Sequence, residues 1–539
     1  MQKILIIQLT RMGDCIQTLP LLKSMKRQRP ESHISVLCVK EFSGIFARSR
    51  FLDRLVSVEA AYILRLRNQG DVDPLRDIPE LGEQYDFVIN LTHNWVGGVF
   101  CSLASGKRKA GRINTQYPEG QVKTDWAKYL FASQKGRTEN LFNIVDMHSA
   151  MAGLVPQPVS EYIEIDSDER RRAAELLRTC GWKNKGRLIA FQPGANQLHR
   201  AWPAECFASL ASRLLIHPDV EIVLLGSQSE KELIRGITAR IPHPVIDLAG
   251  ETRISEIPGV LSLCSMLVSN DTGNIHMAAA SGTTSIGLFF STAYFAETAP
   301  YGEGHVVLQA ELPCSPCNVD EKCDMPACRD VITVPAVESV ALHLLGHSKG
   351  DDFDFPGITA YRSRFVSNGL LLYSPVQQRP ISEHFATGLL HRFLWERAMG
   401  IASPQSDSIE NELLLAPQDV LRTQIDQTAA RLARYESWYS RGRGLLARAE
   451  SDLRLPSPVL ERARATTQAI RGIETAVLSS EDSILKYFHL LHMADTDCAT
   501  YPALVHGAAD SYSRLSALVG CFMHHLSTLR NKLPEGGIQ

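Results

Sequence analysis

The chain has no apolar run long enough to cross a bilayer and no strong excess of charge of either sign. A membrane-spanning helix needs about 20 mostly apolar residues. The stretch that comes nearest, Met277 to Phe295, is interrupted by Ser, Thr and Gly, so we expect a buried helix, a turn and a strand there. The formal net charge of −3 over 539 residues argues against a dedicated nucleic-acid binder, which would be basic. The opening residues show no small-residue cleavage site of a signal peptide. We expect a cytoplasmic protein and leave peripheral membrane contact open.

Disulfide bonds are not expected either, because thiols stay reduced in the cytosol. Eight of the twelve cysteines are scattered singly, among them Cys38, Cys101, Cys264 and Cys521, and read as small core residues.

The other four cysteines are clustered. Cys314, Cys317, Cys323 and Cys328 form a C-x2-C-x5-C-x4-C pattern. Four thiols at this spacing predict a tetrahedral metal site of structural role, since no open coordination position is implied. Zinc is as reasonable as iron on ligand chemistry alone. The alternative is a loop of reduced or redox-active thiols.

Strand-like and helical patterns alternate in two successive sets. The first set contains the strand-like runs Ile4–Leu9, Ile34–Val39, Leu55–Val58 and Phe87–Leu91, and the second extends from about residue 170 to 345. Such alternation calls for parallel sheets with helices on both faces. We predict two Rossmann-like α/β domains, residues 1–165 and 166–348, that face each other across a cleft.

The remainder, residues 349–539, has a different pattern. Ser367-Asn368-Gly369 lies between apolar runs and predicts a hairpin. Beyond it the periodicity is helical, with breaks at Pro404, Pro417 and Pro456, and the segments Asp419–Ser437 and Thr466–Leu478 are amphipathic. This extension is either a helical appendage that packs on the core or on another subunit, or an acceptor-recognition module.

Two turns carry the chemistry. In the first, the apolar run Met266 to Val268 is followed by Asp271-Thr272-Gly273 and then by a helical pattern with His276 in its first turn. A strand that leads into a helix N-terminus presents free N–H groups to a phosphate. In the second, Arg11-Met12-Gly13-Asp14 follows the opening strand. Asp14 is either a helix cap or a general base at the mouth of the sheet.

Further polar residues follow other strands. Arg200, after the Pro193-Gly194 turn, could clamp a diphosphate in bidentate fashion. Glu230 either caps a helix or accepts hydrogen bonds from a ribose or sugar hydroxyl. The densest basic run is Lys107-Arg108-Lys109 with Arg112. It is either a solvated turn or a contact with an anionic acceptor or a membrane surface.

Taken together, these motifs resemble the bacterial heptosyltransferases of glycosyltransferase family 9 over about residues 1–345. The elements that carry the resemblance are Arg11-Met12-Gly13-Asp14 with Pro20, Pro193-Gly194, Arg200-Ala201-Trp202-Pro203, Gly226 with Glu230, and Asp271-Thr272-Gly273 with His276. The resemblance implies a GT-B fold, an ADP-heptose donor and inversion at the anomeric carbon. Asp14 matches the family's proposed base, and Arg200 falls where many members have Lys.

The resemblance also assigns roles to single residues. Donor binding falls on Arg200, Glu230, Asp271, Thr272, Gly273 and His276. The cysteine cluster resembles the cysteine finger of bacterial autotransporter heptosyltransferases, where the implied ion is iron. Acceptor or anion contacts are expected at Arg11, Lys107, Arg108 and Arg112.

The expected reaction is transfer of a heptose to a hydroxyl of lipopolysaccharide core or of a protein. Arg200 and the N–H groups around Thr272 and Gly273 can stabilise the leaving diphosphate without a catalytic metal. The cysteine finger and the helical extension favour a protein acceptor somewhat. Two alternatives are a family member that uses another sugar nucleotide, and an inactive GT-B scaffold with a helical interaction module. No nucleic-acid partner is expected, and a homo-oligomer stays open.

Overall fold

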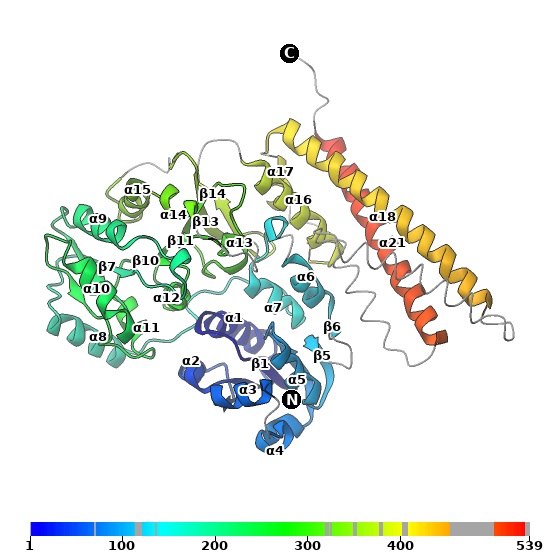
Figure 1. The fold of residues 1–539 in the computed structure, drawn as a ribbon, viewed down its shortest axis with the longest axis horizontal. Coiled ribbons are helices and arrows are strands. Elements are labelled where there is room, and N and C mark those ends of the chain that lie inside the picture. Colours follow the sequence, from blue (N-terminus) through cyan, green and yellow to red (C-terminus); the bar gives the residue numbers. More distant parts are fainter. Residues whose placement is uncertain are drawn as a thin grey trace, which may run out of the picture. The chain divides into compact units, whose positions relative to one another are not determined.

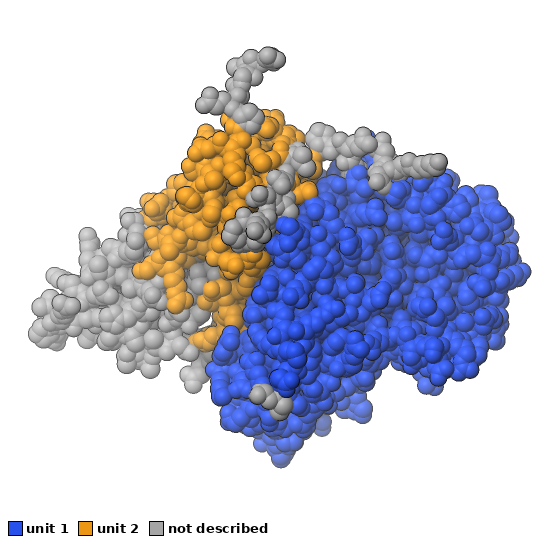
Figure 2. All heavy atoms as spheres, turned by 180° about the vertical axis from the view of Figure 1, so that it is seen from behind, with its two compact units in different colours: residues 1–109, 142–379 blue, residues 110–141, 380–539 orange. Residues whose placement is uncertain are grey.

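The computed structural model describes residues 2–68, 72–113, 121–134, 137–317, 323, 326–348, 353–376, 381–401, 408–414, 416–452 and 501–533. The chain divides into two compact units, which Figure 2 colours separately. Unit 1 consists of residues 1–109 and 142–379, and unit 2 of residues 110–141 and 380–539.

The first sheet has six strands in the order β3-β2-β1-β4-β5-β6. Its strands are β1 (Lys3–Gln8), β2 (His33–Val39), β3 (Arg54–Val58), β4 (Tyr85–Asn90), β5 (Gly106–Ile113) and β6 (Gln121–Lys123). The first four are parallel neighbours, as predicted, and β1 lies between β2 and β4. The apolar side chains of β1 are buried, which is why this strand reads as one continuous apolar run. The β5–β6 pair is antiparallel and was not predicted.

The second sheet has eight strands in the order β14-β13-β12-β11-β10-β7-β8-β9. Six are parallel: β7 (Arg187–Gln192), β8 (Val220–Leu224), β9 (Ile246–Asp247), β10 (Met266–Asn270), β11 (Ser285–Phe289) and β12 (Val306–Ala310). The helices that follow β7, β8 and β10 are α9 (Ala204–Leu214), α10 (Lys231–Thr238) and α12 (Gly273–Ala280).

The predicted hairpin belongs to this second sheet. It forms β13 (Ile358–Phe365) and β14 (Leu371–Pro375), and β13 pairs antiparallel with β12. Gly369 in its turn has a φ of 82°, which favours glycine. The structure therefore differs from the predicted division at residue 348, which placed the hairpin with the helical extension. The antiparallel bonds to β12 join it to the second sheet instead.

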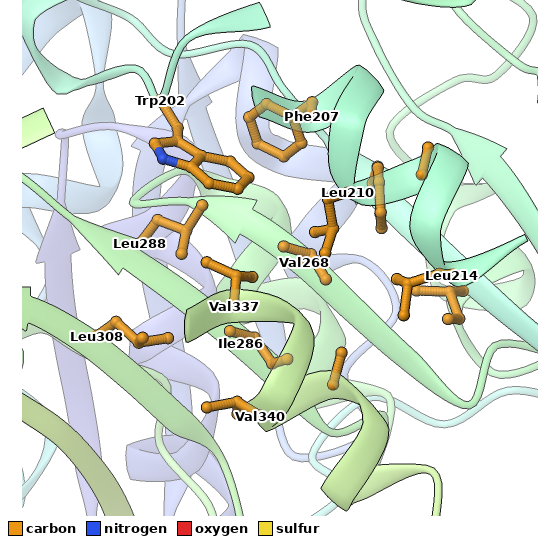
Figure 3. Packing of buried hydrophobic residues seen from close by; sticks show 14 of the residues in the cluster. Trp202, Phe207, Leu210, Leu214, Val268, Ile286, Leu288, Leu308, Val337 and Val340 are labelled. Carbon is orange, nitrogen blue, oxygen red and sulfur yellow. The ribbon is translucent and has the colours of Figure 1, made fainter. Parts of the chain in front are cut away.

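One core cluster holds helices onto this sheet (Figure 3). Phe207, Leu210 and Leu214 of α9 pack over the sheet near Val268, and Val337 and Val340 of α15 (Val334–Leu344) pack beside them. Each large apolar side chain buried in this way contributes about 1.5–3 kcal/mol. Trp202 belongs to the same cluster and packs edge-on against Phe207, with their ring centroids 5.1 Å apart.

Unit 2 is helical where it is described, apart from the strand residues 110–113 and β6. Its helices include α6 (Asp125–Ser133), α16 (Glu383–Ala398), α17 (Ser408–Leu414), α18 (Gln418–Asp452) and α21 (Tyr501–Lys532), and the last two run side by side (Figure 1). The predicted helix Asp419–Ser437 lies within α18, which begins directly after Pro417. Pro404, Pro456 and the predicted helix Thr466–Leu478 lie outside the described residues. In the described ranges, none of the helices combines the length and the apolar character that a membrane span needs.

Candidate active site

Two helix N-termini meet in unit 1. Helix α1 (Met12–Gln28) follows β1, and α12 follows β10. A Cβ on Gly13 would lie 3.0 Å from Cδ2 of His276, and a Cβ on Gly273 would lie 2.0 Å from Cε of Met12. The absence of side chains at both glycines lets the two helix ends approach. Since a helix N-terminus carries partial positive charge and free N–H groups, their meeting point is suited to an anion.

Asp14 is the third residue of α1. Its Oδ2 accepts a hydrogen bond from the backbone N–H of Arg11, at 3.2 Å, so Arg11 is the N-cap residue and Asp14 closes a capping box. Asp14 therefore takes part in capping α1 as the third residue of the capping box, and the N-cap residue itself is Arg11. The carboxylate is half-buried.

His276, in the first turn of α12, is 4% exposed. Burial lowers the pKa of its imidazole, and the nearby carboxylates of Asp271 and Asp14 oppose that shift. Since Asp14 acts electrostatically on His276, the predicted base lies near a predicted donor-binding residue. Nδ1 of His276 makes no hydrogen bond among the described residues.

Arg200 and Asp271 form an ion pair between Nη2 and Oδ2, with side chains 17% and 11% exposed. Two predicted donor-binding residues are thus in direct contact. A guanidinium has five N–H donors, and Asp271 engages only one end of it, so the pair orients Arg200 without using its full donor capacity. Nε of Arg200 is buried without a hydrogen bond in the described part of the chain.

Glu230 closes a capping box on the short 3-10 helix Gln228–Glu230, but its side chain does not cap α10 itself. Its Oε2 accepts hydrogen bonds from N and Oγ of Ser227, at 2.6 and 2.7 Å. Its Oε1 lies against Gly194, where a Cβ would be only 1.4 Å away. The capping bonds fix one oxygen, and the other reaches the Pro193-Gly194 turn, so capping and ligand binding are compatible at this residue.

Thr272 is the N-cap residue of α12, but its side chain does not cap the helix. Its Oγ1 lies 3.1 Å from Oγ of Ser269 instead. The first N–H groups of α12 are therefore not covered by the capping side chain.

Asn270, which the sequence analysis did not single out, joins three of these segments. Its Oδ1 accepts a hydrogen bond from the backbone N–H of Trp202, at 2.9 Å, and its Nδ2 donates to the carbonyl oxygens of Pro193 and Gly194, at 2.8 and 3.3 Å. The position of Asn270 at the end of an apolar strand could have marked it in the sequence, because a buried side-chain amide needs hydrogen-bond partners.

A bond between two side-chain amides was also not predicted. Asn274 of α12 donates to Oε1 of Gln192, at 2.6 Å, and Gln192 is the last residue of β7. This bond holds the start of α12 to the neighbouring strand end.

The basic run lies on strand β5 rather than in a turn, and Lys107 and Arg108 are exposed to solvent there. On β5, Lys107 pairs with Asp86 at 2.8 Å, and Lys109 donates to the carbonyl oxygens of Cys101 and Ser102.

The other members of the predicted anion set are also placed. The guanidinium carbon of Arg108 lies 4.6 Å from the centre of the Phe87 ring. Arg112 is paired with Val122 in the antiparallel register of β5 and β6. Of the four cations proposed to contact an anionic acceptor, Arg11 is the one next to Asp14 in sequence and bonding.

The four clustered cysteines differ in exposure. Cys314 is exposed, Cys317 and Cys328 are buried, and Cys323 is intermediate. Burial raises the pKa of the Cys317 and Cys328 thiols, and negative charge on the other thiols of the cluster raises it further. Cys317 therefore lies within electrostatic reach of the other three cysteines. The described residues nevertheless contain no group of three or more His, Cys, Asp or Glu side chains placed to hold a metal ion. The metal site stays a prediction.

Comparison with known proteins agrees with this geometry. Residues 77–327 match the model of glycosyltransferase family 9 (heptosyltransferase). Lipopolysaccharide heptosyltransferase 3 of Escherichia coli K12 is 21% identical over 290 residues, which cover 52% of this chain and 80% of that protein. Lipooligosaccharide heptosyltransferase 2 of Haemophilus ducreyi is 26% identical over 295 residues, 52% of this chain and 80% of that protein.

The fold is shared with a solved structure. The glycosyl transferase family 9 protein from Veillonella parvula superposes with a TM-score of 0.52 at 20% identity, and the match covers 64% of this chain and 98% of that one. The predicted GT-B fold is thus confirmed: two α/β sheets, with a helical region beyond them. Residues 77–327 thus match glycosyltransferase family 9, and the chain is a glycosyltransferase.

Proposed function

We propose that this glycosyltransferase moves a heptose from ADP-heptose to a hydroxyl of lipopolysaccharide core, with inversion and with Asp14 as general base. The observation that carries the proposal is the contact between the N-termini of α1 and α12, which brings Asp14 near His276. The names of the curated relatives support heptose as the sugar and lipopolysaccharide or lipooligosaccharide as the acceptor class.

The proposed chemistry needs one base and one anion site. Asp14 takes the proton of the acceptor hydroxyl while its oxygen attacks the anomeric carbon from the face opposite the diphosphate. The bond from that carbon to the diphosphate oxygen breaks, and ADP leaves with its negative charge. Arg200 and the N–H groups at Thr272 and Gly273 stabilise this charge, which develops most strongly in the transition state.

The remaining donor residues orient the nucleotide sugar. Oε1 of Glu230 accepts a hydrogen bond from a ribose or sugar hydroxyl, while Oε2 keeps the helix cap. His276 is neutral near pH 7, because burial lowers the pKa of its imidazole. It therefore offers one N–H and one lone pair rather than a charge.

The direct test is Asp14→Asn. The asparagine keeps an oxygen that can accept the Arg11 N–H but cannot take a proton, so we expect transfer to fall by roughly 10²–10⁴-fold while ADP binding by calorimetry is unchanged. Asp73→Asn is the matched control, because Asp73 also accepts a backbone N–H at the start of a helix, α4 (Pro74–Asp77), outside the candidate site. Near wild-type transfer by Asp14→Asn would show that the base is a different group.

A protein acceptor is the second candidate. The helices of unit 2 after residue 380 lie beyond the matched family segment, which ends at residue 327, and this addition to the chain supports a second kind of acceptor. Intact-mass analysis after incubation with ADP-heptose and either heptose-free lipopolysaccharide or candidate proteins separates the two acceptors. Parallel reactions with other sugar nucleotides test the donor.

We also propose that Cys314, Cys317, Cys323 and Cys328 bind a structural iron or zinc ion. Their spacing and their mutual electrostatic effect support this proposal. Metal analysis of the purified protein should give about one ion per chain, and Cys314→Ser should lower that content. A metal-free, fully active protein would favour the reduced-thiol alternative.

We place the enzyme in the cytoplasm, at the inner face of the inner membrane, where Arg11, Lys107, Arg108 and Arg112 contact the anionic acceptor. Arg11→Gln should then raise the KM for lipopolysaccharide and leave the KM for ADP-heptose unchanged. Cell fractionation tests the location. Size-exclusion chromatography with light scattering tests whether the chain forms a homo-oligomer.

A further inference from the structure

Helix α7 (Ile144–Met151) packs against α1, the helix that carries Asp14 (Figure 1). It is also bonded to segments of the second sheet's half of unit 1. Asp146, 3% exposed, accepts a hydrogen bond on Oδ1 from the Tyr301 hydroxyl, at 2.8 Å, and on Oδ2 from the backbone N–H of Leu371, at 2.9 Å. One buried carboxylate thus joins α7 to a loop and to the first residue of β14.

A second side chain anchors the start of the same helix. Oδ1 of Asn143 caps α7 by accepting the N–H of Val145, at 3.0 Å, and its Nδ2 donates to the carbonyl oxygen of Ala299, also at 3.0 Å. The loop that contains Ala299 and Tyr301 is therefore bonded to α7 at two points.

The residues bonded to α7 are connected through the second sheet to the predicted donor-binding residues. Leu371 opens β14, which pairs with β13 and through it with β12 and β11, and β11 neighbours β10, the strand that precedes α12. A buried carboxylate is costly unless it is hydrogen-bonded, so the bonds of Asp146 hold this arrangement firmly.

From this geometry we propose that Asp146 is a positioning residue for transfer. By holding α7 to the Tyr301 loop and to β14, it fixes α1, and with it Asp14, relative to the donor residues at α12. It touches neither substrate in this scheme. The proposal rests on the proposed function, because it assumes that Asp14 is the base and α12 the donor site.

Two tyrosines provide a matched test. Tyr301 and Tyr373 are both 3% exposed, and each donates one hydroxyl hydrogen bond at 2.8 Å. The Tyr301 hydroxyl reaches Asp146 on α7, whereas the Tyr373 hydroxyl reaches the carbonyl oxygen of Pro300. Tyr301→Phe and Tyr373→Phe therefore make the same chemical change, but only the first removes a bond to α7.

The readout is the ratio of donor hydrolysis to transfer, with ADP-heptose and heptose-free lipopolysaccharide. A displaced base lets water compete with the acceptor, so Tyr301→Phe and Asp146→Asn should raise this ratio about tenfold and lower kcat, with the KM for ADP-heptose unchanged. Tyr373→Phe should keep the wild-type ratio. Loss of folded enzyme alone would lower kcat without changing the ratio, and that result would overturn the proposal.

Hydrogen exchange gives a second readout that needs no turnover. Amides in the first turns of α1 should exchange faster in Tyr301→Phe than in wild type or in Tyr373→Phe. Equal protection in all three proteins would overturn the positioning role even if the chain used a different sugar nucleotide. A different outcome would contradict the proposed function alone. In that case Tyr301→Phe exchanges faster than wild type, but the wild-type protein neither transfers nor hydrolyses ADP-heptose.

Discussion

At the scale of single residues, the polar groups of the site hold one another in place. Arg200 is paired with Asp271, Glu230 bonds Ser227, and Asp14 bonds the Arg11 amide. Among the described residues, each of these bonds engages one end of the side chain, such as Nη2 of Arg200 or one carboxylate oxygen of Glu230 and Asp14. Preorganisation of this kind reduces the entropy that a ligand would otherwise have to remove on binding.

Gly194→Ala should weaken donor binding. A Cβ there would collide with Oε1 of Glu230, at 1.4 Å, so the carboxylate must move and its cap on Ser227 is disturbed. We expect the ADP-heptose dissociation constant to rise about tenfold or more, measured by calorimetry. Gly44→Ala is the control, because a Cβ at Gly44 meets no atom within 4 Å. An unchanged affinity would show that Glu230 takes no part in binding.

Arg200→Lys separates charge from geometry. Lysine keeps the cation that faces Asp271 but loses the planar fork that can bind a diphosphate through two parallel bonds. The loss of one charge-assisted bond, about 1.5–3 kcal/mol, should weaken ADP binding by roughly 10–100-fold. Arg213→Lys, at an ion pair with Glu338 on α15, should bind ADP normally. Equal affinities for both variants would argue against a bidentate clamp.

At the scale of elements, the parallel strands β1 to β4 were predictable to within two residues, because strands buried on both faces must be apolar. The predicted run Ile34–Val39, for example, differs from β2 by one residue at its start. β5 could not be recognised, since it carries Lys107, Arg108 and Lys109, which are rare in strands. Its side chains bond to Asp86 and to the end of α5 (Trp95–Leu103), and these tertiary contacts override the local preference.

Charge or a family motif marked the candidate residues Asp14, Arg200 and Asp271 in the sequence, and their roles stay predictions. Asn270 was not found because its role depends on two turns far away in the sequence, at Pro193 and Trp202. A single sequence does not show which strand ends will be neighbours. The predicted Arg200 and Asp271 roles were likewise assigned separately, although the two side chains form one ion pair.

Asn270→Ala tests how far one amide holds these turns together. The change removes bonds to Trp202, Pro193 and Gly194 and leaves buried groups without partners, so we expect a loss of about 2–4 kcal/mol in unfolding free energy. Urea unfolding measures it. Asn68→Ala, at the exposed end of α3 (Ala60–Arg67), should change stability by less than about 0.5 kcal/mol. A similar small effect at Asn270 would show that the turns hold without it.

At the scale of the whole molecule, buried histidines make the fold sensitive to acid. Burial lowers the pKa of His148 to about 3 and that of His305 to about 4, from an ordinary value of 6.5. Below pH 6.5 the unfolded chain takes up protons that the folded protein does not. Stability is therefore full above that pH and decreases as the pH falls toward the folded values.

We expect each of these two groups to reduce the unfolding free energy by about 1.4 kcal/mol per pH unit below pH 6. Urea unfolding at pH 7, 6 and 5 measures the slope. His148→Asn should reduce the slope, whereas His243→Asn, at an exposed position, should not. If the two variants show the same slope as wild type, burial of His148 does not govern acid stability.

Unit 2 is assembled from two stretches of chain, residues 110–141 and 380–539. The early stretch has its partners in the late one: the Leu141 carbonyl accepts from Arg392, and Tyr129 packs on Trp395. During synthesis the early stretch therefore lacks its packing partners while residues 142–379 are translated, which takes on the order of ten seconds or more. Its apolar side chains are a target for chaperones in that interval. A gene truncated after residue 379 would leave residues 110–141 without these partners, so it would not yield a minimal enzyme.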